Sequence, residues 1–124
     1  MGTITNTGLE YISKILNGLA DNEFTYIALG TDSTAEATSN TSLGAENTTL
    51  GAARKQATCT YISPGTASFN VLFSFSGNVT VREIGIFDAA SGGNLLYRRV
   101  LAANRNYSDG DAAEFTVTIP ITRA

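Results

Sequence analysis

The feature that most restricts the fold of this 124-residue chain is an alternation of apolar and polar side chains between residues 67 and 76. Leu72 is the one apolar residue among the positions that are otherwise polar. Because successive side chains of a β-strand point to opposite faces of its sheet, the pattern predicts a strand with one face in the core and one in solvent. The residues of the apolar parity are Phe69, Val71, Phe73 and Phe75.

The same alternation returns at the end of the chain. Thr116, Thr118 and Thr122 occupy the polar parity of this last strand. Pro120 has no N–H group to donate to a neighbouring strand, so we expect this strand to lie at the edge of its sheet. The apolar parity consists of Phe115, Val117, Ile119 and Ile121.

Further strands are predicted where β-forming residues stand between turn signals, and the turns fall at 63–66, 77–78 and 91–93. Five or six short strands of this kind predict a mostly β fold, either a β-sandwich or a jelly-roll-like arrangement, with one N-terminal α-helix. The first of these strands is apolar on both faces, so we expect it to be well covered. The additional strand segments are residues 24–30, 57–62, 79–86 and 95–101.

The strand at 79–86 contains a change of phase, because its apolar parity switches across Arg82 and Glu83. A β-bulge, or a strand that passes from one sheet to another, would produce this switch. The charged pair itself is expected to face solvent or to pair across strands, with contact to another subunit as the alternative.

The helix is predicted from Thr7, whose side chain forms a capping box with Glu10. Asn17 and Gly18 supply the expected end of the helix. The apolar residues between these signals recur at three- and four-residue steps and predict one stripe that faces the core. The stripe consists of Leu9, Ile12, Ile15, Leu16 and Leu19.

Residues 31–51 are rich in Thr, Ser, Asn, Ala and Gly and predict a long surface loop, with Leu43 and Leu50 as contacts to the body. A loop of this length is usually functional or disordered, so it is a candidate contact surface. The length of the chain suits one hydrophobic core. We therefore expect residues 1–124 to form a single β domain with an N-terminal helix and this loop.

Charge and hydropathy argue against two classes of partner. The formal net charge is −3 and the eight Lys and Arg residues form no run longer than a pair, so we expect no nucleic-acid partner. The apolar runs are far shorter than the roughly 20 residues that cross a bilayer, and the N-terminus lacks the features of a signal peptide. We expect neither a membrane partner nor export.

The chain offers little for catalysis. Cys59 is the lone cysteine, there is no His to activate it, and its parity predicts a buried structural thiol. Asp109 and Asp111 form the closest carboxylate pair, but a turn around Gly110 explains them more simply. We therefore expect no enzymatic activity and no cofactor.

The sequence also lacks the patterns of a metal site and of a phosphate-binding loop. Residues 104–111 are rich in oxygen-bearing side chains, yet they lack the spacing and the terminal Glu of an EF-hand loop. Gly92 and Gly93 have no accompanying Lys and do not stand between a strand and a helix, so they indicate a hairpin. We expect no catalytic, cofactor-binding or metal-binding residues.

Several motifs together carry a resemblance to a known class of proteins. They are Val81–Ala89 (V-R-E-I-G-I-F-D-A), Gly93–Arg99 (G-N-L-L-Y-R-R), Asp109–Asp111, Tyr26–Thr31 and Thr41–Glu46. With these motifs the chain resembles small structural proteins of tailed bacteriophages, both capsid decoration proteins and tail-fibre-like β modules. The resemblance implies a component of the virion and offers no catalytic residues to transfer.

The first functional hypothesis is a virion structural protein, made in the host cytoplasm, that acts as a capsid decoration (cement) protein or a small tail component. It would bind other capsid or tail proteins and form a homo-oligomer, for which a trimer is one option. Residues 1–6 and the loop 31–51 would bind the neighbouring subunit or shell and become ordered on assembly.

The alternative hypothesis is an adhesion module of a tail fibre that binds a carbohydrate or a receptor. Tyr26, Tyr97 and Tyr107 would stack on sugars, although tyrosines on strands more often serve as half-buried packing residues. An enzyme is a third and weaker hypothesis that rests only on Asp109, Asp111 and Glu114.

Overall fold

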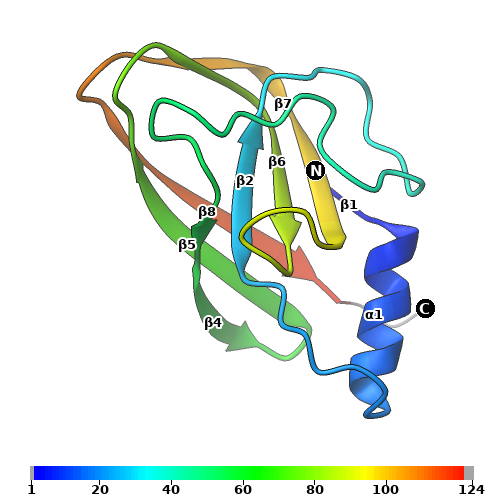
Figure 1. Ribbon diagram of the computed structural model, residues 1–124. Helices are drawn as coiled ribbons and strands as arrows, with labels where there is room; N and C mark the ends of the chain where they lie inside the picture. The colour runs from blue at the N-terminus through cyan, green and yellow to red at the C-terminus, as the bar shows by residue number, and fades with distance from the viewer. Residues whose placement is uncertain (1, 122–124) are drawn as a thin grey trace.

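The computed structural model describes residues 2–121, and these form two antiparallel sheets and one α-helix. The larger sheet has the strand order β1-β7-β6-β2-β3 and the smaller sheet the order β4-β5-β8. In Figure 1 the strands of the smaller sheet run across those of the larger one. The mostly β prediction with one N-terminal helix is confirmed. The elements are β1 (Thr3–Ile4), α1 (Asn6–Leu16), β2 (Tyr26–Gly30), β3 (Lys55–Gln56), β4 (Thr58–Ser63), β5 (Thr66–Ser74), β6 (Val79–Phe87), β7 (Leu95–Tyr107) and β8 (Ala112–Pro120).

The main core lies between the two sheets and is built from the alternation seen in the sequence. The apolar parity of β5 is buried and Phe73 is completely inaccessible to solvent, whereas Leu72 on the opposite parity is exposed. Phe73 meets Phe115 of β8 edge to face, with ring centroids 5.6 Å apart. Such aromatic pairs add about 0.5–1.5 kcal/mol to the stabilisation that comes from burial. The pattern at residues 67–76 therefore predicted both the strand and its buried face.

Two further predictions about the sheets are confirmed. The register of β6 against β7 shifts between Val81 and Glu83, which is the bulge expected from the change of phase. β8 is the edge strand of the smaller sheet, as Pro120 indicated. Thr122, which the sequence placed on the polar parity of this strand, lies outside the described residues.

The start of the helix was predicted wrongly. α1 begins at Asn6, and Thr5 rather than Thr7 is its N-cap. The Thr5 hydroxyl accepts the Gly8 N–H at 2.9 Å and donates to the Leu95 carbonyl of β7 at 2.6 Å. Thr5 is the cap because its hydroxyl also bonds to β7. This tertiary contact cannot be recognised from a local sequence motif. The end is as expected, since Asn17 is the C-cap and Gly18 has a positive φ.

The predicted apolar stripe of the helix is only partly buried. Ile12 packs against the core, together with Tyr11. The helix comes so close to β7 at Gly8 that a methyl group there would stand 2.5 Å from the Leu96 carbonyl oxygen. This contact fixes which face docks, and it turns the remaining stripe residues toward solvent. Those exposed residues are Leu9, Ile15, Leu16 and Leu19.

The loop at 31–51 lies against the outer face of the larger sheet. Leu43 is buried there and joins a second apolar cluster with Phe87 and Leu95, so its predicted contact with the body is confirmed. Leu50 is 45% exposed, but its side chain lies against Gly77 and its carbonyl accepts the Ser76 N–H at 3.0 Å, so it contacts the body without being buried. Leu50 has φ 57° and precedes Gly51 with φ 82°, so this left-handed turn directs the side chain along the surface.

Within the described range 2–121, no helix has the length and apolar character required to span a membrane.

Candidate interaction surface

The two charged residues at the bulge differ in exposure, since Arg82 is half-buried and donates to the Leu101 carbonyl of β7 at 2.8 Å. Glu83 is fully buried, and its carboxylate forms an ion pair with Arg98 of β7, with 2.9 Å between Oε1 and Nε. The same carboxylate accepts backbone N–H groups from Asp32, Gly44 and Ala45 at 2.8–3.0 Å. The cross-strand interpretation is correct for both residues, and the solvent-facing one is wrong for Glu83. These bonds hold the loop at 31–51 to its own sheet.

The segments expected to bind a neighbour already have partners within the chain. Thr3 and Ile4 form β1 and pair with Arg98 and Tyr97 of β7. Asp32 contacts the Arg98 guanidinium at 3.4 Å, and hydrogen bonds from Thr34 to its carboxylate lower the pKa of Asp32. Assembly is therefore not needed to order these parts of the two segments, while Met1 lies outside the described residues.

The candidate acidic site is a turn. The chain bends between β7 and β8, and Asp111 accepts the Ser108 N–H at 2.7 Å, which is the simpler interpretation given by the sequence. Glu114 lies on the exposed face of β8. Among residues 2–121, no group of three or more His, Cys, Asp or Glu side chains is placed to hold a metal ion.

The three tyrosines proposed to stack on sugars are packing residues. Tyr97 is buried between the sheets, and its burial raises the pKa of its hydroxyl. Tyr107 stacks on Phe75 with centroids 4.7 Å apart. Tyr26 packs against the second cluster beneath the loop. The packing interpretation is confirmed for all three.

Of the described strands that are exposed at every residue, β4 is the longest. All six of its residues are exposed, and it forms the outer edge of the smaller sheet. The prediction that Cys59 is a buried thiol was therefore wrong. Its parity faces inward, opposite Phe69, but the larger sheet does not cover this part of β4. Partial burial, and then the charge of Glu23, raise the pKa of the Cys59 thiol.

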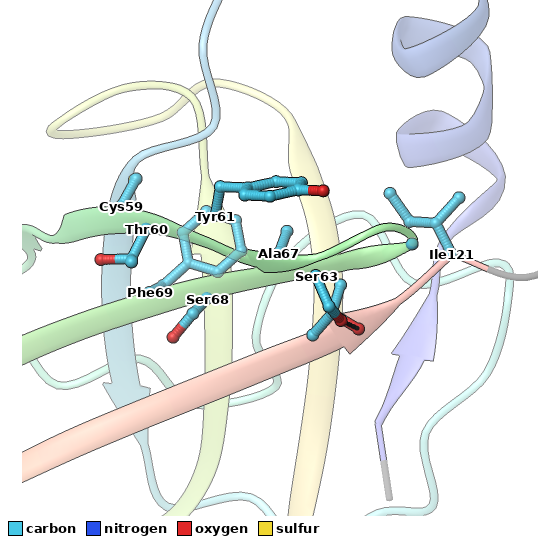
Figure 2. Close-up of a pocket in the computed structure, with 10 residues that line it drawn as sticks. Cys59, Thr60, Tyr61, Ser63, Ala67, Ser68, Phe69 and Ile121 are labelled. Carbon is cyan, nitrogen blue, oxygen red and sulfur yellow. Dashed lines mark hydrogen bonds between the residues drawn. The ribbon is translucent and has the colours of Figure 1, made fainter.

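Next to β4 the uncovered inner face forms an open apolar hollow of about 400 Å³. Figure 2 shows Tyr61 and Ile121 projecting on the same side of the β4–β5 hairpin, together with Cys59 and Ala67. Tyr61 is 74% exposed although it is aromatic. Phe69 forms part of the wall of the hollow. An aromatic side chain or a strand from another molecule would find apolar contacts here.

The exposed large apolar residues are concentrated in two places. Apart from Leu50 and Leu72, all of them belong either to α1 and the turn after it or to the hairpin region. Both α1 and the β4–β5 turn lie toward the lower end of the molecule in Figure 1. We call these two groups of exposed residues together the apolar end. Its most exposed members are Leu16, Leu19, Tyr61, Ile62 and Ile121.

The sequence did not reveal the apolar end. Its pattern placed the apolar stripe of the helix against the core, and it placed Cys59 on a buried face of the strand that is now β4. One signal was available. From Gln56 to Phe69 the chain contains no charged residue, although the segment includes a turn and a solvent-exposed strand. A long uncharged segment that is exposed favours contact with another protein.

The comparisons with known proteins bear on what such a surface serves. A family model described as "Podophage GP4 fiber I protein gp80" matches residues 13–119. The chain belongs to this family. A search of curated proteins finds no match. The resemblance to small structural proteins of tailed bacteriophages is confirmed, and the chain is a structural or tail component of a phage virion.

Proposed function

We propose that the chain is a tail-fibre component that attaches to other virion proteins through its apolar end. The concentration of exposed apolar side chains at one end carries this proposal, since scattered apolar residues are normal on a monomer but a gathered set marks a contact site. The fibre description of the family supports the tail over the capsid. The proposed role is binding, without catalysis.

The chemistry of the apolar end suits a permanent contact. Leu16 is 86% exposed, and burying a leucine of this kind contributes about 1.5–3 kcal/mol. Glu10 and Lys14 form an exposed ion pair on the same helix, of the kind found at the polar rim of an interface. We also propose that the protein is a homo-oligomer, as the sequence led us to expect.

Sedimentation of the labelled protein with purified phage tails, and separately with emptied capsids, tests the role. We expect binding to tails, and we expect Leu16→Asp to abolish it because a charge would enter the apolar contact. Leu72→Asp is the matched control, since Leu72 is also exposed but lies on β5, outside the apolar end. Binding to capsids alone would instead support a decoration protein, and binding to neither would support an adhesion module.

A further inference from the structure

β4 has an outer edge that no strand among residues 2–121 covers, because it ends the sheet order β4-β5-β8. Its residues from Thr58 to Ser63 are all exposed. An edge of this kind presents a row of N–H and C=O groups that can pair with a further strand. The edge therefore offers backbone hydrogen bonds in addition to the side chains of the apolar end.

This edge carries neither charge nor proline, and its irregularity is a register shift between Tyr61 and Ser63, near the turn. Charged side chains and prolines on an edge strand discourage another strand from joining it. β8, at the opposite edge of the same sheet, carries both Glu114 and Pro120, whereas β4 carries neither type of residue. The edges of the larger sheet, β1 and β3, are only two residues long each. Among the described strands, β4 is therefore the longest edge without charge or proline, and its regular part runs from Thr58 to Tyr61.

A second copy of this chain fits the edge by charge and by symmetry. The chain has a net charge of −3, but β4 is uncharged, so two copies that meet here oppose no like charges within the strand. A two-fold axis brings the same strand to itself in antiparallel orientation, which is the self-complementary arrangement that symmetric dimers require. The edge therefore favours an uncharged strand as its partner, and β4 of a second copy is such a strand.

The side chains agree with this pairing. With Thr60 on the two-fold axis, Tyr61 of the second copy comes opposite Cys59, where side chains are about 4.5–5.5 Å apart. Cys59 lines the apolar hollow, so the incoming tyrosine ring covers that hollow on each side of the axis. On the outer parity, the Thr60 side chains of the two copies meet at the axis, while Ile62 lies at the register shift, beyond the regular part of the strand. β-branched and aromatic cross-strand pairs of this type stabilise sheets.

We propose that two copies of the chain pair antiparallel through β4 and join their smaller sheets into one continuous sheet. In this pairing, a second copy of the chain is the partner of the β4 part of the apolar end. The biological role of the dimer rests on the proposed function. The helical part of the apolar end, with Leu16 and Leu19, stays open in this dimer and is left for other virion proteins.

Light scattering across a concentration series tests the pairing, with the chain mass of 13.0 kDa as the unit. We expect the mass to rise from one chain to two, and Thr60→Lys to remain at one chain. Thr118→Lys is the matched control, because Thr60, Ser68 and Thr118 pair in one row across the sheet and Thr118 lies at its far edge. This control should dimerise like the unmodified protein.

Cys59 provides a second readout in the unmodified protein, since it lies on the proposed interface and is the only thiol of the chain. Its alkylation rate, measured at one alkaline pH, should fall as the dimer forms. One chain at all concentrations, a trimer, a Thr60→Lys protein that still dimerises, or an unchanged alkylation rate would each overturn the pairing. Tail binding by the monomeric Thr60→Lys protein would show that the proposed function stands separately from the pairing.

Discussion

Replacing Glu83 by Gln should destabilise the protein strongly, although the two side chains have nearly the same shape. The carboxylate accepts four N–H groups, from Arg98, Gly44, Ala45 and Asp32, at 2.8–3.0 Å. Its Oε1 and Oε2 each accept two of them. A glutamine has a single oxygen, so its NH₂ group would face two of these donors. Arg98 would lose the buried partner at 2.9 Å and keep only Asp32, at 3.4 Å and partly exposed.

The magnitude follows from the buried pair. Removing one member of a buried ion pair costs about 3–5 kcal/mol, because the other charge stays desolvated. A domain of this kind has a total stability of about 5–15 kcal/mol. With a urea slope of about 2 kcal/mol per molar, the midpoint of unfolding should fall by about 2 M. The loop should also loosen, since Gly44 and Ala45 lose their acceptor.

Urea unfolding followed by circular dichroism measures this change. Glu114→Gln is the matched control, since Glu114 is exposed on β8 and its loss should alter stability by no more than about 0.5 kcal/mol. A loss of less than about 1 kcal/mol for Glu83→Gln would refute the reasoning that the carboxylate joins the loop to the sheet.

Three further predictions concern stability. Thr5→Val keeps the shape of the buried cap but removes its hydrogen bonds to Gly8 and Leu95, so unfolding experiments should show a loss of about 1–3 kcal/mol. Phe73→Ala should cost about 3–5 kcal/mol in the same assay, because it empties the centre of the core. Burial acts to raise the pKa of Asp88, but hydrogen bonds from Asn94 and Asn22 outweigh it and hold that pKa below its usual value. The unmodified protein should therefore be more stable than Asp88→Asn. This difference should have its largest value above about pH 4 and should shrink as the pH falls through the pKa of Asp88 in the folded protein.

Much of the sheet structure could be predicted because its signals are local. The alternation around Phe73 identified β5 and its buried face, and the parity change at Glu83 identified the bulge. Pro120 marked an edge strand. Each of these signals depends on the backbone period of two or on a missing N–H group, which neighbouring residues reveal without knowledge of the rest of the fold.

The features that escaped prediction depend on what packs against them. Cys59 has the parity of a buried residue, yet it is exposed because the facing sheet does not cover that part of β4. Thr5 replaces Thr7 as the helix cap because it docks on β7. Glu83 is buried because Arg98 and the loop come to it from distant parts of the chain. The apolar end was missed for the same reason, since its helical residues have a core-like spacing.

We propose that this family member is a tail component of the virion that acts by protein–protein assembly. Immunogold electron microscopy of intact phage particles, with antibodies raised against the purified chain, tests it most directly. We expect gold particles on the tail and its fibres, with the capsid unlabelled. Label confined to the capsid surface, or virions from which the protein is absent, would contradict the account.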